Sequence, residues 1–299
     1  MSNFISANKL KDTRVLLLGG TSGIGFAVAR ASLEHGASVI LSSSNPTKVS
    51  DAITRLKTLY PEEPYVSRIA GTACDLGKDD DAIEAEIVKL YEFATRPDLF
   101  GTTAGPSEGV ERVPINHTVF TAGSVPRTLP PTDPNVTASY LRSLNTIRFI
   151  GGALLAKHAP TYMALPKPTT GIPTTDPRIP SSSITYTSGA LAVRPMPGMS
   201  LGIAGAGSVE VLARALAVDL APHGIRVNVV APGAVFTEML EAIGQAAGGV
   251  EGLLAGYAGE SVLGRVGAPE DTAEAYLALM RDGFATGGLV RSDGGFTLK

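Results

Sequence analysis

A glycine-rich loop follows the first apolar run of the chain. The segment LLLGGTSGIGFAVA places Gly19, Gly23 and Gly25 between residues typical of a buried strand and residues typical of a helix. Glycines at such a turn allow backbone amides and a helix N-terminus to approach a diphosphate group. The expected contacts of this loop also include Thr21, Ser22 and Ile24. The sequence therefore predicts a dinucleotide site here, with a tight turn that binds no ligand as the alternative.

The second apolar run ends in hydroxyl-bearing residues. In VILSSSNPTK, Ser43, Ser44 and Asn45 follow the run, and Lys48 comes one helical turn later. An aspartate here would bind the ribose hydroxyls of NAD and repel a 2′-phosphate, whereas hydroxyl and ammonium groups bind that phosphate. We therefore expect NADP as the cofactor. Capping of a helix that begins near Pro46 is the alternative role for these polar side chains.

A stretch in the second half of the chain lacks side chains for proton transfer. None of the side chains of residues 196–209 gains or loses a proton near neutral pH. The residues that follow, up to Leu220, have the apolar spacing of a buried helix, so the stretch is ordered. The role of residues 196–209 at the start of this helix depends on which other elements lie beside them.

The elements that must position these residues alternate along the sequence. Short apolar runs typical of strands are followed by longer patterns typical of helices. The expected strands are 14–20, 38–43, 67–76, 117–123, 183–189, 225–233 and 287–295. This pattern predicts an α/β fold with a Rossmann-like, doubly wound sheet of seven parallel strands. Residues 1–299 are expected to form a single domain, with loop insertions at about 95–114 and 164–182.

Composition and charge limit the class of protein. The 299 residues include 25 basic and 28 acidic side chains, spread along the chain, and offer no basic surface for nucleic acid or an anionic membrane. No apolar run approaches the roughly 18 residues of a membrane span. The lone Cys74 excludes an internal disulfide, and the first residues do not resemble a secretion signal, so we expect a cytoplasmic protein. The expected partner is a small-molecule substrate, without nucleic acid, membrane or metal.

Several motifs together resemble the short-chain dehydrogenase/reductase family over nearly the whole chain. The glycine spacing at 19–25 is similar to the family's TGxxxGxG loop, with Leu18 in place of the usual Thr. Three later strand ends resemble the family's adenine-binding Asp-apolar pair, its NNAG segment and its PGxxxT motif, which holds the nicotinamide carboxamide. The matching residues are Asp75 and Leu76, then Thr121, Ala122 and Gly123, then Pro232, Gly233, Val235 and Thr237. The segment TTAG at 102–105 is a rival for the NNAG position.

The resemblance also identifies what the helix after the fifth run lacks. The family places a Tyr-x3-Lys pair there, in which Tyr is the general acid or base and Lys lowers its pKa. The aligned positions carry Gly202 and Ala206, and no other Tyr lies between Tyr186 and Tyr257. The stretch without acid–base groups therefore resembles an oxidoreductase site that has lost its proton chemistry and become roomier.

Three polar residues remain as candidates for catalysis. Ser188 resembles the family's catalytic Ser, with Thr187 as an alternative because the spacing is one residue longer. Arg148, on a helix expected at 137–163, lies at or beside the family's structural Asn. Arg194 lies on the loop expected to face the substrate. A surface position for Arg148 and a rim charge for Arg194 are the alternatives.

The loop around Arg194 carries a second resemblance. Fungal bifunctional reductase/Diels–Alderases of bicyclic indole alkaloid biosynthesis also lack the Tyr/Lys pair, and they carry Pro-Asp-Pro-Arg where this chain reads Pro-Met-Pro-Gly at 195–198. This resemblance implies a neighbouring subfamily, an NADP(H)-binding enzyme of secondary metabolism. Because no Tyr supplies a proton, we expect it to reduce an iminium ion, or to cyclise or isomerise a bulky small molecule. Met196 would lie on the apolar wall of its pocket.

Two alternative functions and an oligomeric state complete the expectations. A non-catalytic NADP-binding regulator is one alternative function, and a carbonyl reductase with a substituted proton donor is another. The family resemblance implies a homodimer or homotetramer. Its subunits would pair through the helix at 137–163 and the small-residue face of the helix that ends at Leu220.

Overall fold

A sheet of seven parallel strands forms the centre of the protein, in the order β3-β2-β1-β4-β5-β6-β7. The computed structural model describes residues 6, 8–78, 80–100, 111–123, 129–163 and 182–299. The strands are β1 (Arg14–Leu18), β2 (Ser38–Ser43), β3 (Ile69–Ala73), β4 (His117–Phe120), β5 (Ser182–Thr187), β6 (Ile225–Pro232) and β7 (Leu289–Ser292). The sheet confirms the predicted fold class. Its order reverses between β1 and β4, the place where ligands bind in sheets of this kind.

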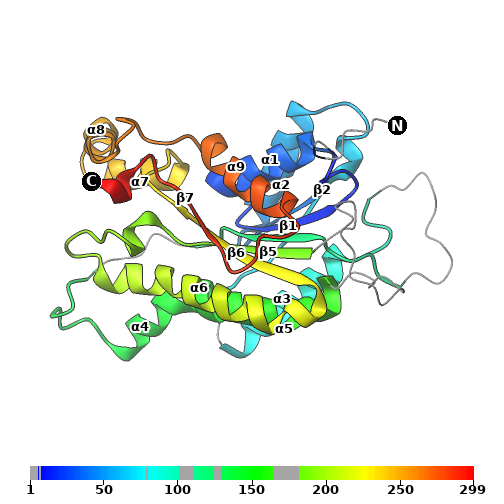
Figure 1. Ribbon diagram of the computed structural model, residues 1–299, viewed down its shortest axis with the longest axis horizontal. Coiled ribbons are helices and arrows are strands. Elements are labelled where there is room, and N and C mark those ends of the chain that lie inside the picture. The colour runs from blue at the N-terminus through cyan, green and yellow to red at the C-terminus, as the bar shows by residue number, and fades with distance from the viewer. Residues whose placement is uncertain (1–5, 7, 79, 101–110, 124–128, 164–181) are drawn as a thin grey trace.

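Helices cover both faces of the sheet (Figure 1). On one face lie α1 (Gly23–Glu34), α2 (Pro46–Leu59) and α9 (Pro269–Arg281), and on the other lie α3 (Asp80–Ala94), α5 (Gly152–Met163) and α6 (Ser200–Asp219). Leu16 and Leu18 pack with the second group, whereas Val15 and Leu17 pack with the first. Successive strand residues thus supply two apolar cores, one on each face. Because both faces are covered, every residue of β1, β4, β5 and β6 is buried.

The helix expected at 137–163 is divided into three parts. α4 (Ala138–Asn145) is followed by a π-helical segment, Thr146–Gly151, and then by α5. The π-helical segment carries Arg148. Segments of this kind are frequent at functional sites, because they change the direction in which side chains point from a helix.

Two helices near the carboxyl edge of the sheet were not expected from the sequence. α7 (Glu238–Ala246) and α8 (Val250–Glu260) follow β6 and lie together at one end of the molecule, near the C-terminus (Figure 1). None of the eleven residues of α8, all of them described, is buried. A Cβ added to Gly252 or Gly256 would meet no described side chain or neighbouring element within 4 Å. α8 therefore has no buried side chain to attach it to the rest of the protein, although it packs against α7.

The predicted insertions fall mainly outside the described residues. The residues that are not described are 101–110 of the first insertion and 164–181 of the second. Ser182, which the prediction placed at the end of the second insertion, begins β5 instead. The rival segment at 102–105 also lies outside the described residues.

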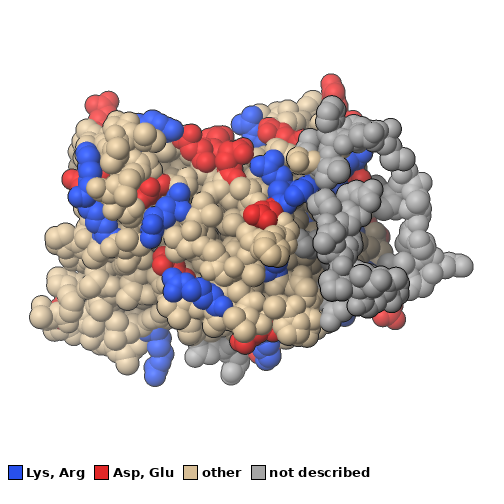
Figure 2. Space-filling model, viewed as in Figure 1, with Lys and Arg blue, Asp and Glu red and all other residues tan. Residues whose placement is uncertain are grey.

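Two surface properties of the described part bear on the charge and membrane expectations. On the face shown in Figure 2, basic and acidic side chains are interspersed. Among the described helices, only α6 has the length and mean hydropathy of a membrane span. This helix packs on β5 and β6, with Val209, Ala213 and Ala217 buried at helical spacing, so it has the place of a core helix.

Candidate active site

A cavity of about 1030 Å³ lies at the carboxyl edge of the sheet, beside the reversal between β1 and β4. Loops that follow the strands line it, together with residues of α4, α6, α7 and α8. All residues predicted to bind the cofactor line this cavity except Asn45. They are Gly19, Thr21, Ser22, Gly23, Ile24, Gly25, Ser43, Ser44, Lys48, Asp75, Leu76, Thr121, Ala122, Gly123, Pro232, Gly233, Val235 and Thr237. Segments that are distant in the sequence therefore meet around one space.

The glycines of the loop at 19–25 leave no room for a side chain at their own positions. Gly19 has φ +85°, and a Cβ on it would lie 2.7 Å from the Ala122 backbone nitrogen. A Cβ on Gly25 would overlap the Gly19 carbonyl oxygen. Thr121 joins this loop to the end of β4, because its hydroxyl donates to the Leu18 carbonyl oxygen at 3.0 Å. The loop is held close to both strands, which exposes the start of α1 to the cavity.

A carboxylate already occupies the N-terminal end of α1. The Gly23 backbone amide, in the first turn of this helix, donates to Glu238 Oε2 at 2.9 Å. Glu238 lies in the first turn of α7 and lines the cavity. Amides at a helix start attract anions. The Gly23 amide thus already binds one anionic group in this structure, and Glu238 is a cavity residue that sequence reasoning missed.

The end of β2 provides hydroxyl groups and one ammonium group. Ser42 Oγ is buried without a hydrogen-bond partner among the described residues, and Ser42 lines the cavity with Ser43, Ser44 and Lys48. Asn45 instead caps α2, because its side-chain oxygen accepts from the amides of residues 47 and 48. The predicted capping role is thus correct for Asn45. The two serines and the lysine keep the positions expected of a phosphate site.

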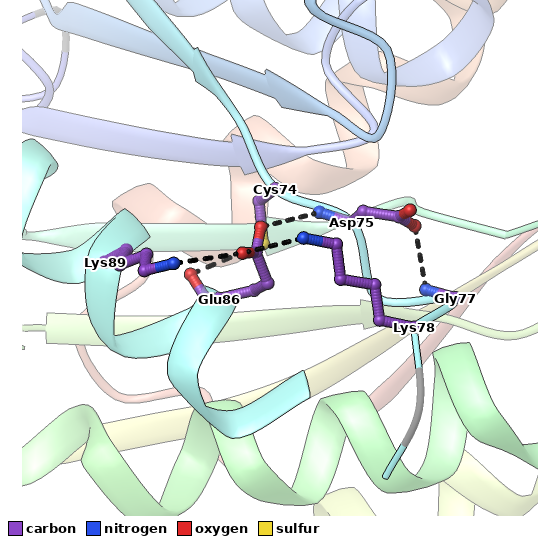
Figure 3. A network of polar contacts seen from close by, with 6 residues as sticks. All are labelled: Cys74, Asp75, Gly77, Lys78, Glu86 and Lys89. Atoms are coloured by element: carbon purple, nitrogen blue, oxygen red, sulfur yellow. Dashed lines mark hydrogen bonds and ion pairs between the residues drawn. The ribbon is translucent and has the colours of Figure 1, made fainter. Parts of the chain in front are cut away.

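Residues after β3 form a polar network at the expected adenine end of the site (Figure 3). One Asp75 carboxylate oxygen accepts from the Gly77 amide at 2.9 Å, and the Asp75 amide donates to Glu86 at 3.4 Å. Glu86 also accepts from Lys78, whose ammonium is the main cause of the lowered pKa of Glu86. Burial, followed by the charge of Glu86, raises the pKa of Cys74 to about 12, so its thiol stays protonated. The network holds Asp75 and Leu76 at the cavity wall.

The loop after β6 closes the cavity from the opposite side. The Gly233 amide donates to the Ser292 carbonyl oxygen at 2.9 Å, and a Cβ on Gly233 would lie 2.7 Å from Asp293 Cα. Thr237 caps α7, because its hydroxyl accepts from the Leu240 amide at 3.3 Å. The hydroxyl can still donate its own proton. These positions agree with the PGxxxT resemblance.

Arg148 reaches the cavity from the π-helical segment. Its Nη1 donates to the Thr187 carbonyl oxygen at 2.7 Å, and a Cβ on Gly123 would lie 2.6 Å from its Nη2. Glycine at 123 therefore gives the guanidinium group its place over the strand end. Burial lowers the pKa of Arg148. An arginine nevertheless keeps its charge at neutral pH, so Arg148 is a cationic donor at this wall.

Ser188 and Thr187 have separate partners at the end of β5. The Ser188 hydroxyl donates to Glu210 Oε1 on α6 at 2.6 Å. The Thr187 hydroxyl shares a hydrogen bond of 2.7 Å with the buried hydroxyl of Tyr276 on α9. Both residues line the cavity, so the structure leaves both alternatives in contact with it. Glu210 was missed by sequence reasoning.

The positions aligned with the family's Tyr and Lys face the cavity. Gly202 and Ala206 on α6 both line it. A Cβ on nearby Gly205 would lie 2.9 Å from the Leu144 carbonyl oxygen, so the small residues of α6 also let α4 approach closely. Tyr257 of α8 lines the cavity as well, and sequence reasoning did not single it out.

Arg194 and Met196 do not belong to the cavity wall. Arg194 Nη2 forms an ion pair of 2.6 Å with Glu260, and its guanidinium carbon lies 4.6 Å from the ring centre of Phe296. Phe296 lines the cavity, so Arg194 contacts a residue of the cavity wall from outside the cavity. Met196 is exposed, and Met199 lines the cavity in its place.

The whole chain is similar to known proteins. A family model described as an SDR-like Rossmann domain matches residues 6–299. The short-chain dehydrogenase/reductase malC of Malbranchea aurantiaca is 38% identical over 294 residues, which cover 98% of each chain. The short-chain dehydrogenase/reductase ucsE of an Acremonium species is 35% identical and covers 97% of each.

A solved structure confirms the resemblance expected from the motifs. The structure of the MalC reductase/Diels-Alderase from Malbranchea aurantiaca covers 98% of this chain and 100% of its own, with a TM-score of 0.81. By sequence, by fold and by the placement of its motifs, this chain belongs to the short-chain dehydrogenase/reductase family.

Proposed function

We propose that this protein is an NADP(H)-dependent enzyme of natural-product metabolism that reduces a carbon–nitrogen double bond in a bulky small molecule. The observation that carries the proposal is that Gly202 and Ala206 line the cavity where the family has Tyr and Lys. A ketone that takes up hydride needs a proton, and a positioned acid accelerates such a step by about 10²–10⁴-fold. An iminium ion is charged before it is reduced, so its reduction does not depend on that acid.

The residues at the sheet edge fit a nicotinamide dinucleotide phosphate. The glycine loop and the start of α1 would hold the diphosphate, Ser43, Ser44 and Lys48 the 2′-phosphate, and Thr237 the carboxamide. The unpartnered Ser42 hydroxyl and the glycine positions that exclude a side chain support this fit. A reduced nicotinamide held here supplies hydride, and an iminium carbon that takes it up yields a neutral amine without a proton from the protein.

The substrate would lie between the cofactor site and α6. Arg148 and Ser188 are the polar side chains that would orient it, and Met199, Ile203 and Met239 would form its apolar wall. Space that Tyr and Lys fill elsewhere in the family is left to the substrate. Orientation in such a pocket also favours a non-redox cyclisation or isomerisation, which needs few polar contacts.

The test compares an iminium ion with a ketone of similar shape. NADPH consumption is followed with 1-methyl-3,4-dihydroisoquinoline, which is protonated at neutral pH, and with 1-tetralone. We expect turnover of the imine and a ketone rate at least about tenfold lower. Arg148→Ala should reduce imine turnover by ~10²-fold, because a lost orienting contact misplaces the reacting atoms. Tight NADP binding without turnover of either compound would favour the non-catalytic regulator.

Tyr257 favours a second candidate, the carbonyl reductase with a substituted proton donor. It contributes to the cavity wall from α8. Under the main proposal, Tyr257→Phe leaves imine turnover within about twofold, since that step takes no proton from the protein. A loss of ketone turnover in this variant, together with a ketone rate above the imine rate in the parent protein, would establish the second candidate instead.

We further expect a homodimer or homotetramer in the cytoplasm. Val211 and Val218, seven residues apart on α6, are 68% and 73% exposed. This apolar outer face differs from the predicted small-residue face, whose Gly205 packs on α4, and it supports pairing of subunits through α5 and α6. Light scattering at micromolar concentration checks the state, and a monomer would contradict this expectation.

A further inference from the structure

The hydroxyl proton of Ser188 points to a carboxylate rather than to the cavity. We infer that Glu210 is a positioning residue that makes Ser188 a hydrogen-bond acceptor toward the substrate. The site would then select a substrate that presents an N–H group or a protonated nitrogen at this wall. This inference rests on the proposed function and names the chemical group that the site recognises.

The geometry of the Ser188–Glu210 contact supports this role. The distance of 2.6 Å from Ser188 Oγ to Glu210 Oε1 lies in the range of hydrogen bonds between hydroxyl and carboxylate. A carboxylate can only accept, and a serine hydroxyl has a single proton. Ser188 is 7% exposed and lines the cavity. What its oxygen offers to a bound molecule is therefore lone pairs and a partial negative charge.

The register of α6 explains why Glu210 lies behind Ser188. Gly202, Ala206 and Glu210 are spaced by four residues, so they follow one another along one face of the helix. The first two line the cavity, and the third meets the end of β5. The face that has lost the family's proton-transfer pair thus keeps one charged group, one turn further along the helix.

The neighbouring polar groups supply complementary functions. The Thr187 hydroxyl is paired with Tyr276, and the Thr187 carbonyl oxygen accepts from Arg148. Arg148 is a donor only, whereas Ser188 with its proton committed is an acceptor. Ser188 would accept from an N–H of the substrate, and Arg148 would donate to an acceptor atom elsewhere on it. A ketone oxygen placed against Ser188 would face another acceptor and leave both without a partner.

Equilibrium binding to the NADP-saturated protein tests this without turnover. The probes are 1,2,3,4-tetrahydroisoquinoline, which is a protonated secondary amine at neutral pH, and isochroman, its neutral oxygen analogue. Calorimetry should give the amine about tenfold the affinity of isochroman, as expected for one hydrogen bond to a charged group. Glu210→Gln, which keeps the size and removes the charge, should reduce this preference to about twofold or less.

Two further variants separate positioning from folding. Ser188→Ala should reduce the preference in the same way, and adding Glu210→Gln to it should change little more, because the two residues act through one contact. Asp219→Asn, on the exposed end of the same helix, removes the same charge and should leave the preference intact. Unchanged NADP affinity in each variant checks that the fold is retained.

The outcomes distinguish this inference from the proposed function. Equal affinity for the two probes, failure to bind the amine, or a preference that survives both Glu210→Gln and Ser188→Ala would overturn the inference. A Glu210-dependent preference for the amine without any NADPH consumption would support the inference and contradict the proposed reduction. Imine turnover together with a preference for the amine that does not depend on Glu210 would support the proposed reduction and contradict the inference.

Discussion

At the scale of single residues, we expect the end of β2 to decide whether NAD or NADP binds. Ser43, Ser44 and Lys48 line the cavity and offer hydroxyl and ammonium donors. We expect Ser44→Asp to weaken NADPH binding at least about tenfold, because the new carboxylate repels a 2′-phosphate, while NADH binding changes little. Fluorescence titration measures both affinities. Ser50→Asp, on the exposed side of α2, adds the same charge as a control. If Ser44→Asp weakened the affinity for both nucleotides equally, or for neither of them, the 2′-phosphate would have to bind elsewhere.

Glu238 is a residue whose charge would oppose a diphosphate bound at the start of α1. Its carboxylate accepts from the Gly23 amide, which the proposed diphosphate would also need. We expect Glu238→Gln to strengthen NADP(H) binding by about three- to tenfold, since repulsion between anions is removed. Glu241→Gln, at an exposed position of the same helix, should have little effect. Weaker binding in Glu238→Gln would mean that this contact holds the loop in its binding conformation instead.

At the scale of elements, variants of α6 test whether the substrate occupies the space beside Gly202 and Ala206, where the family has Tyr and Lys. Gly202→Tyr combined with Ala206→Lys should retain NADP binding but lose imine turnover, because two large side chains enter the substrate's part of the cavity. Stopped assays and nucleotide titration measure the two properties. Ser50→Tyr with Thr54→Lys repeats the spacing on the exposed side of α2 as a control. Full activity of the α6 double variant would show that the substrate does not use this space.

Elements with strong local patterns could be predicted from the sequence, and contacts between distant elements could not. β1 and β6 are rich in apolar residues, and the glycine loop has its own spacing, so these features are visible locally. α8 was missed because Gly252, Gly256 and its exposed residues give little apolar periodicity. Glu238 meets Gly23 across 215 positions, which no spacing rule reveals. Glu210 had a detectable signal, since it continues the four-residue spacing from Gly202 and Ala206.

At the scale of the whole molecule, a buried histidine links stability to pH. His117 begins β4 and shares a hydrogen bond of 2.9 Å with Ser183 Oγ. Burial, followed by the charge of Arg226, lowers the pKa of His117 to about 3. The unfolded chain has a histidine pKa of about 6.5, so it binds a proton below that pH while the folded protein does not. The free energy of unfolding should therefore fall as the pH falls from about 6.5 toward 3.

Urea unfolding at pH 7.5 and pH 5 measures the contribution of His117. Between these values this residue should account for about 2 kcal/mol of lost stability. His117→Gln, which keeps a polar side chain that does not titrate, should remove that part of the pH dependence. His223→Gln, at an exposed position, should not. A pH dependence unchanged by His117→Gln would mean that the folded protein accepts the proton after all.

The weak attachment of α8 has a consequence for how molecules enter and leave. This helix has no buried residue among its eleven, yet it supplies Tyr257 to the cavity wall. Local opening needs the least free energy where packing is poorest, so α8 should detach while the sheet stays folded. Its amide hydrogens should exchange with solvent far sooner than those of α9. Gly252→Ala with Gly256→Ala should slow that exchange, because alanine favours the helix by up to about 1 kcal/mol per site. If passage past α8 limits turnover, the same variant should lower the turnover rate while it stabilises the helix. The local opening of one glycine-rich helix would then set the rate of the enzyme.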